Sequence, residues 1–232
     1  MRRETLSALN AARRDGRAIV RATDLSTGEE LLIDPATDAS ALGEAAAGAA
    51  RADTSGPALI EGRSWFLAVF NPPLDLAIVG AVHVAQPLAR MAQEAAYRVR
   101  IIDPRTAFAT AARFPGIALS HDWADEAFDK EPLGRRSAVV FLTHDPKLDD
   151  PGLIAALTSN CFYIGALGSK KTQAARAARM REAGFGDAAL TRIHGPVGLD
   201  IGARTPAEIA VAILAEITLA LRGKKRGSSP SP

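Results

Sequence analysis

Residues 74–92 read LDLAIVGAVHVAQPLARMA, a short apolar run that ends in Gly80 and turns directly into a helical pattern. The run 74–79 is almost continuously apolar, which predicts a strand covered on both faces in a parallel sheet. From Val84 onward, apolar residues recur at spacings of three and four, so they share one face of a helix that includes Ala95. A second apolar run, VRIIDP, then places Asp103 where a dinucleotide-binding unit carries the acid that contacts ribose. Together these segments predict a βαβ unit.

The turn after the first strand matches only part of the dinucleotide-binding pattern G-x-G-x-x-G/A. Its six positions are Gly80, Ala81, Val82, His83, Val84 and Ala85. The first glycine permits the tight turn, and the small last residue permits close packing of helix on strand. Val82 replaces the middle glycine, which normally lets the backbone approach a pyrophosphate. Binding of NAD(P) or a flavin dinucleotide thus stays possible but is weakened by Val82.

Composition narrows the class of protein. The chain has 232 residues and a net charge of +2, and Lys224, Lys225 and Arg226 account for the excess. This balance gives no indication of nucleic-acid binding. No apolar run is long enough to span a membrane and the N-terminus has no signal-like apolar region, so we expect a cytoplasmic protein. The single cysteine, Cys161, excludes a disulfide framework and is expected to be a buried core residue rather than a nucleophile.

Asn71, Pro72 and Pro73 interrupt every periodic pattern and predict a domain boundary. Before them, residues 1–72 predict a small α+β domain with helices at 4–15 and 39–52 and two hairpin-like strand pairs. After them, strand and helix patterns alternate through residues 73–222, which predicts a Rossmann-like, doubly wound parallel sheet. We expect strands near 74–80, 98–103, 117–120, 137–142 and 161–166, a final helix capped by Thr205, and a disordered basic tail at 223–232.

Ligands of such sheets bind beyond the carboxyl ends of the strands, where the strand order reverses. With the order 3-2-1-4-5, this point lies between the first and fourth strands, which end in Gly80–His83 and in FLTHDP. His83 and His144 therefore have two interpretations. They can be a helix cap and a polar turn, or the pair can supply donors to an anionic ligand, with Asp145 fixing the tautomer of one imidazole. His121 follows the remote third strand, and two histidines alone do not define a metal site.

The fifth strand ends in YIGALGSKKT, a second glycine-bearing turn before a helix. Gly165 and Gly168 allow unusual backbone angles, Ser169 can cap the helix, and Lys170 and Lys171 add positive charge to its positive end. This combination is suited to a phosphate, although it also fits a simple turn before a solvated basic helix. The spacing does not match a Walker motif.

The segment RIHGPVGLDIGARTP, residues 192–206, is too irregular for a helix or strand. Its glycines and prolines predict either a structural lid or a ligand contact through Pro196, Gly198 and Asp200. Asp200 can alternatively pair with Arg204.

Taken together, THDxxxD at 143–149, YIGxxGSKK at 163–171 and IHxPxGLDIGARTPxEIAxAILAEI at 193–217 resemble the Rossmann domain of the XdhC/CoxI family. These are accessory proteins of molybdenum hydroxylases such as xanthine dehydrogenase and carbon monoxide dehydrogenase. The resemblance implies a carrier rather than an enzyme. Such a carrier binds the molybdenum cofactor (molybdopterin), assists its sulfuration or protects it, and delivers it to an apo molybdenum hydroxylase.

Two departures from the family pattern shape this expectation. The family usually has G-A-G-H-V after the first strand, where this chain has Val82 in place of the second glycine. The GSSPR-type and GGGC-type stretches of longer members do not occur in residues 1–72, which suggests a shortened or divergent N-terminal domain. Two other classes of function remain open, an NAD(P)-dependent oxidoreductase and a scaffold that docks a cysteine desulfurase and a hydroxylase. A homodimer is also possible.

Overall fold

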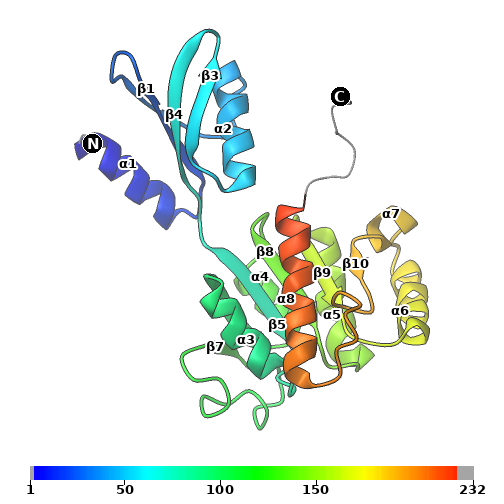
Figure 1. The fold of residues 1–232 in the computed structure, drawn as a ribbon. Helices are drawn as coiled ribbons and strands as arrows, with labels where there is room; N and C mark the ends of the chain where they lie inside the picture. The colour runs from blue at the N-terminus through cyan, green and yellow to red at the C-terminus, as the bar shows by residue number, and fades with distance from the viewer. Residues whose placement is uncertain (1–2, 224–232) are drawn as a thin grey trace. The chain divides into compact units, whose positions relative to one another are not determined.

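The computed structural model describes residues 3–223, so the predicted basic tail lies, apart from Gly223, outside the described residues. The chain divides into two compact units, one ending at Pro72 and one beginning at Pro73 (Figure 1). Each unit has its own sheet and its own hydrophobic core.

The smaller unit is a four-stranded antiparallel sheet with the order β2-β1-β4-β3. Its elements are α1 (Arg3–Arg14), β1 (Ile19–Asp24), β2 (Glu30–Ile33), α2 (Ala41–Ala52), β3 (Gly56–Ile60) and β4 (Arg63–Phe70). The pairs β1–β2 and β3–β4 are the two expected hairpins. Helix α2 packs on one sheet face, where alternate strand residues such as Val20, Trp65 and Leu67 are buried.

The larger unit is a six-stranded sheet in which every neighbouring pair is parallel. Its elements are β5 (Leu74–Val79), α3 (Ala85–Glu94), β6 (Tyr97–Ile102), β7 (Ala118–Ser120), α4 (Ala124–Lys130), β8 (Ser137–Phe141), α5 (Pro146–Thr158), β9 (Tyr163–Ala166), α6 (Lys170–Glu182), α7 (Asp187–Leu190), β10 (Ile193–His194) and α8 (Pro206–Arg222). The order β10-β9-β8-β5-β6-β7 confirms the predicted order of the first five strands. Strand β10 was not predicted, because two residues are too few to show a period.

Helices cover both faces of this sheet, as Figure 1 shows. Leu76 and Ile78 of β5 pack with α3 and α8, whereas the alternate residues Ala77 and Val79 pack with α4, α5 and α6. Complete burial of an aliphatic side chain such as Ile78 contributes about 1.5–3 kcal/mol, so both layers stabilise the central strand. The predicted doubly wound fold is confirmed.

The ends of α3 and α8 show how local sequence sets helix length. Thr205 accepts a hydrogen bond from the Glu208 backbone at 3.3 Å, and the Glu208 carboxylate accepts one from the Thr205 backbone at 2.9 Å. This capping box confirms the predicted start of α8, and Gly223 follows its last residue. Helix α3 ends earlier than expected, so Ala95 is an exposed C-cap rather than part of the buried stripe. Within residues 3–223, no helix is long and apolar enough to cross a membrane.

Candidate functional site

The turns after β5 and β8 meet at the carboxyl edge of the sheet, where the chain order reverses. Gly80 has φ +104°, and a Cβ atom there would lie 2.6 Å from the Thr143 Cγ2 atom. A side chain at position 80 would therefore be strained and would collide with the neighbouring turn. Val82, in contrast, is partly buried and packs on the core. The close approach of Thr143 is thus sufficient to explain the glycine at position 80.

Asp103 organises this turn from within the protein. Its Oδ2 atom accepts hydrogen bonds from the Ala81 backbone at 2.8 Å and from Arg105 Nη2 at 2.7 Å. Its Oδ1 atom accepts from the Arg105 backbone at 3.0 Å and from Arg105 Nε at 2.8 Å. Burial raises the pKa of Asp103, but these hydrogen bonds outweigh that effect and hold it below its usual value. The carboxylate is thus bound by Ala81 and Arg105, and the ribose contact expected of Asp103 stays a prediction.

Arg105 is a cation at this edge that was not predicted from the sequence. Its guanidinium lies 4.7 Å from the ring centre of Phe108, and its side chain is about one-third exposed. The hydrogen bonds to Asp103 raise the pKa of Arg105 above its ordinary value, and the charges of Asp145 and Asp149 add to this shift. Those two aspartates follow β8 in the chain. The sequence signal that could have identified Arg105 was its position two residues after Asp103.

The two histidines at this edge are both exposed. His83 does not cap α3, because the N-cap residue is Val84. His144 has φ +62°, a left-handed conformation that is uncommon for a residue other than glycine. Asp145 caps α5 by accepting a hydrogen bond from the Lys147 backbone at 3.0 Å. Within residues 3–223, Asp145 forms no hydrogen bond with His83 or His144, so in this structure its carboxylate caps the helix.

The turn between β9 and α6 has the features expected of an anion site. Gly168 has φ +141°, and Ser169 caps the helix by accepting a hydrogen bond from the Thr172 backbone at 3.2 Å. Lys170 and Lys171 are exposed in the first turn of this 13-residue helix. Gly165 has a different role from the one expected. It lies inside β9, where a Cβ atom would lie 2.5 Å from Val197 Cγ2, so close packing explains it.

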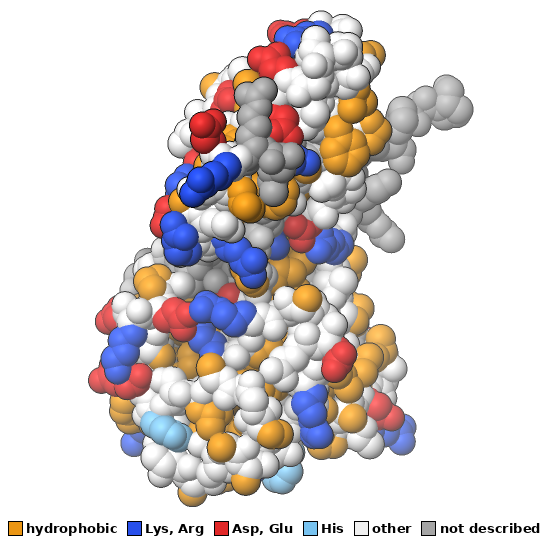
Figure 2. All heavy atoms as spheres, turned by 90° about the vertical axis from the view of Figure 1, so that its left-hand side faces the viewer, with side chains coloured by type: hydrophobic (Ala, Val, Ile, Leu, Met, Phe, Trp, Pro, Cys, Tyr) orange, Lys and Arg blue, Asp and Glu red, His pale blue; other side chains and the backbone are white. Residues whose placement is uncertain are grey.

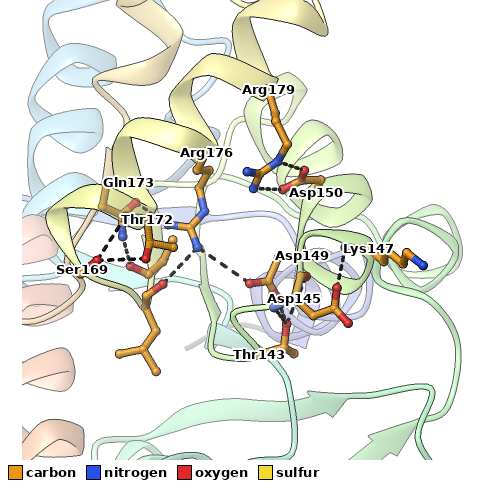
Figure 3. A network of polar contacts seen from close by, with 12 residues as sticks. Thr143, Asp145, Lys147, Asp149, Asp150, Ser169, Thr172, Gln173, Arg176 and Arg179 are labelled. Carbon is orange, nitrogen blue, oxygen red and sulfur yellow. Dashed lines mark hydrogen bonds and ion pairs between the residues drawn. The ribbon is translucent and has the colours of Figure 1, made fainter.

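A buried polar network joins the turns after β8 and β9 (Figure 3). Thr143 Oγ1 donates to Asp149 Oδ1 at 2.6 Å, and Arg176 Nη2 lies 3.9 Å from Asp149 Oδ2. The same Nη2 atom donates to the Leu167 carbonyl at 3.0 Å. Asp149 and Arg176 are each only 2% exposed, and burial raises the pKa of Asp149 to about 6. Neither residue was predicted as a site from the sequence, because the two lie on different helices.

The loop after β10 is held by Glu216 of α8. The Glu216 carboxylate accepts hydrogen bonds from the Tyr163 hydroxyl at 2.6 Å and the Gly198 backbone at 2.6 Å, and its Oε1 atom lies 3.1 Å from His194 Nδ1. The His194 ring stacks on Tyr163 at 4.6 Å. Burial and the neighbouring Glu216 both raise the pKa of Tyr163. An acidic residue within the apolar pattern AVAILAEITLAL was the signal that could have identified this anchor.

The remaining residues of this loop divide between structure and surface. Gly198 has φ +97° and lies against Ala212, so packing requires a glycine there. Pro196 and Asp200 are exposed. Within residues 3–223, Asp200 forms no ion pair with Arg204, whose backbone instead donates to Glu208 at 2.8 Å.

The described part of the chain offers few reactive or metal-binding groups outside these turns. Cys161 is buried, as expected, and burial raises the pKa of its thiol. Among residues 3–223, no group of three or more His, Cys, Asp or Glu side chains is arranged to hold a metal ion. On the face of the molecule drawn in Figure 2, acidic and basic side chains are interspersed rather than gathered by sign. The turns at the carboxyl edge of the larger sheet are therefore the best candidate site.

Comparison with protein families gives a match to the XdhC Rossmann domain over residues 76–217. The chain is 32% identical over 148 residues to the molybdenum cofactor insertion chaperone PaoD of Escherichia coli K12, a match that covers 64% of this chain and 40% of PaoD. It is also 32% identical over 157 residues to a probable xanthine dehydrogenase subunit of Bacillus subtilis 168, covering 66% of this chain and 44% of that protein. The matched region is thus less than half the length of either relative.

Among solved structures, a crystal structure described as a xanthine dehydrogenase from Bacillus halodurans has a TM-score of 0.68. The match covers 98% of this chain and 67% of that chain at 23% identity. At this identity the likeness concerns the fold alone.

Proposed function

The chain belongs to the XdhC family, and from that membership we propose that it binds the molybdenum cofactor and assists its insertion into a molybdenum hydroxylase. The proposal includes assistance in sulfuration of the cofactor or protection of the sulfurated form. Support comes from PaoD, which is named as a molybdenum cofactor insertion chaperone, and from a second relative named as a probable subunit of xanthine dehydrogenase. The hydroxylase would be of the xanthine dehydrogenase or carbon monoxide dehydrogenase type.

The observation that carries this proposal is the turn between β9 and α6. The molybdenum cofactor ends in a phosphate, and a helix N-terminus offers backbone N–H groups and a positive dipole end to such a group. Gly168 opens the turn, Ser169 caps the helix, and Lys170 and Lys171 add two exposed positive charges. Arg105, His83 and His144 lie in neighbouring turns of the same edge and can contact other polar groups of the ligand.

In this proposal the cofactor is cargo and the protein is a carrier. Its partner is an apo molybdenum hydroxylase, and a cysteine desulfurase that supplies sulfur is a further proposed partner. We also propose a cytoplasmic location and a homodimer, which a size-exclusion measurement with light scattering can test directly.

The oxidoreductase alternative loses support from the geometry of the first turn. Asp103 is occupied by Ala81 and Arg105, and Val82 packs on the core where a dinucleotide needs a glycine. Titration with NAD and NADP, followed by nucleotide fluorescence, tests this alternative. Saturable micromolar binding with turnover would replace the carrier proposal. The scaffold alternative predicts stable complexes with desulfurase and hydroxylase in the absence of any bound pterin.

The carrier proposal is tested on protein purified from a host that makes the cofactor. We expect bound molybdenum and pterin, and we expect the protein to increase activation of an apo hydroxylase in a reconstitution. Charge-assisted hydrogen bonds are worth about 1.5–3 kcal/mol each, so Lys170→Ala with Lys171→Ala should reduce retained pterin by at least about tenfold. The matched control is Arg181→Ala, at the other end of the same helix, where Arg181 pairs with Asp187 on the surface.

Two results would contradict the proposal. One is a preparation that holds no pterin and does not raise hydroxylase activation. The other is a double lysine variant that retains as much cofactor as the unaltered protein, which would remove the phosphate from this turn.

A further inference from the structure

We propose that the buried Asp149–Arg176 pair couples the turns after β8 and β9, so that the charge on Asp149 regulates the shape of the phosphate-binding turn. This inference rests on the proposed function for the identity of the ligand. The coupling itself is a property of the ligand-free protein and can be measured without cofactor.

The first half of the coupling runs from the turn after β8 to α5. Thr143 lies against Gly80, so the turns after β5 and β8 are in contact. The Thr143 hydroxyl accepts a hydrogen bond from the Asp145 backbone at 3.1 Å and donates to Asp149 at 2.6 Å. A movement of Asp149 is therefore transmitted to the turn that carries His144.

The second half runs from α6 to the turn after β9. Arg176 donates to the Leu167 carbonyl at 3.0 Å and also to the side-chain oxygen of Gln173. The Gln173 amide in turn donates to the Ala166 carbonyl at 2.8 Å. One guanidinium thus holds, directly and through Gln173, the two carbonyl groups that precede Gly168.

The joint between the two halves is a charge pair rather than a hydrogen bond. Arg176 Nη2 and Asp149 Oδ2 are 3.9 Å apart, and the two side chains are 3% and 2% exposed (Figure 3). Within residues 3–223, Asp149 Oδ2 and Arg176 Nε have no hydrogen-bond partner. Attraction between charges at this distance is much stronger in a buried site than in water. Loss of the Asp149 charge would therefore leave Arg176 buried without its counter-ion.

Asp149 can lose its charge near neutral pH. Burial raises its pKa to about 6, although the Thr143 hydrogen bond and the Arg176 charge oppose the shift. The other charged groups that act on it are Asp150 on its own helix, Arg179 on α6 and Arg105 after β6. As pH falls through about 6, Asp149 takes up a proton and the charge pair is lost. The coupling predicts that the turn at 167–172 then loosens.

Amide hydrogen exchange of the ligand-free protein, corrected for the intrinsic pH dependence of exchange, tests this. Asp149→Asn keeps an acceptor for Thr143 but removes the charge. At pH 7.5 we expect it to raise exchange at 167–172 by at least about tenfold, with exchange in β5 unchanged. Arg176→Lys, which keeps the charge but loses the planar fork, should loosen the same turn. In the unaltered protein, exchange at 167–172 should rise as pH falls through about 6, and Asp149→Asn should abolish this dependence.

Asp150→Asn is the matched control. Asp150 pairs with Arg179 across the same two helices, at 2.5 and 3.0 Å, and within residues 3–223 it forms no hydrogen bond with either turn. It should leave exchange at 167–172 unchanged. The inference is overturned if Asp149→Asn leaves exchange at 167–172 unchanged, or if it raises exchange in β5 as much as at 167–172. It is also overturned if Asp149→Asn and Asp150→Asn give the same dependence of exchange on pH.

Cofactor retention separates this inference from the proposed function. If the unaltered protein holds pterin but Asp149→Asn retains it equally at pH 7.5, regulation is refuted and the carrier function stands. If the unaltered protein holds no pterin, the proposed function fails and the regulatory role fails with it.

Discussion

Glu216 is expected to contribute strongly to the stability of the larger unit. Glu216→Ala would leave the buried Tyr163 hydroxyl and the Gly198 backbone N–H without their acceptor, since both donate to this carboxylate at 2.6 Å. Each buried polar group that loses its partner costs about 1–3 kcal/mol. The bond to the more exposed His194 adds less. We therefore expect the free energy of unfolding to fall by about 2–6 kcal/mol.

The assay is unfolding in urea, monitored by pulsed hydrogen exchange and peptide mass spectrometry, which measures the stability of each compact unit separately. Tyr163→Phe removes the Tyr163 hydroxyl, one of the two donors that lose their acceptor in Glu216→Ala. The double variant should thus be less destabilised than the sum of the single variants. Glu94→Ala, on the exposed end of α3, is the control and should change stability little. A loss below about 1 kcal/mol for Glu216→Ala, or strict additivity in the cycle, would refute the anchoring role.

Three further outcomes follow from the same structure. Gly80→Ala should cost about 2 kcal/mol or more and lower the melting temperature clearly, because it combines φ +104° with a collision at Thr143, whereas Gly28→Ala, at φ +75° but in open space, should cost less. The pKa of Asp103 is lower in the folded than in the unfolded protein, so its contribution to stability is present above the unfolded pKa of about 4 and is lost as pH falls through the folded pKa. In acid titrations of unfolding, the stability difference between the unaltered protein and Asp103→Asn should therefore shrink below a pH of about 4. Glu208→Ala breaks the capping box of α8 and should cost about 1 kcal/mol in the same unfolding assay, and no loss would show that the cap is dispensable.

Local patterns were sufficient for the elements that surround the site. The apolar run before Gly80 and the helical spacing after it predicted β5 and α3, and Thr205 with Glu208 predicted the start of α8. These signals lie within a few residues of one another, so they can be read from the sequence without knowledge of any tertiary contact. The short strand β10 was not predicted from the sequence, because it is defined only by its pairing with β9.

The candidate site was predictable only in part. Its location followed from the strand order, because parallel strands bring their carboxyl ends to one edge. Ser169 and its two lysines were also expected, since capping and charge are local properties. The hydrogen-bond partners of individual side chains could not be predicted from the sequence. Asp103 was expected to contact a ligand, and only the fold shows that it also binds Ala81 and Arg105.

By itself, the sequence determined the class of fold, the order of its elements and the position of the turns that form the candidate site, because hydrophobic period, glycine and capping residues act over short distances along the chain. Only the tertiary structure decided which polar groups meet. Asp149 faces Arg176 and Glu216 faces Tyr163 across helices and strands that are far apart in sequence. Such pairs depend on the packing of whole layers, and burial then gives their charges an influence that no local pattern reveals.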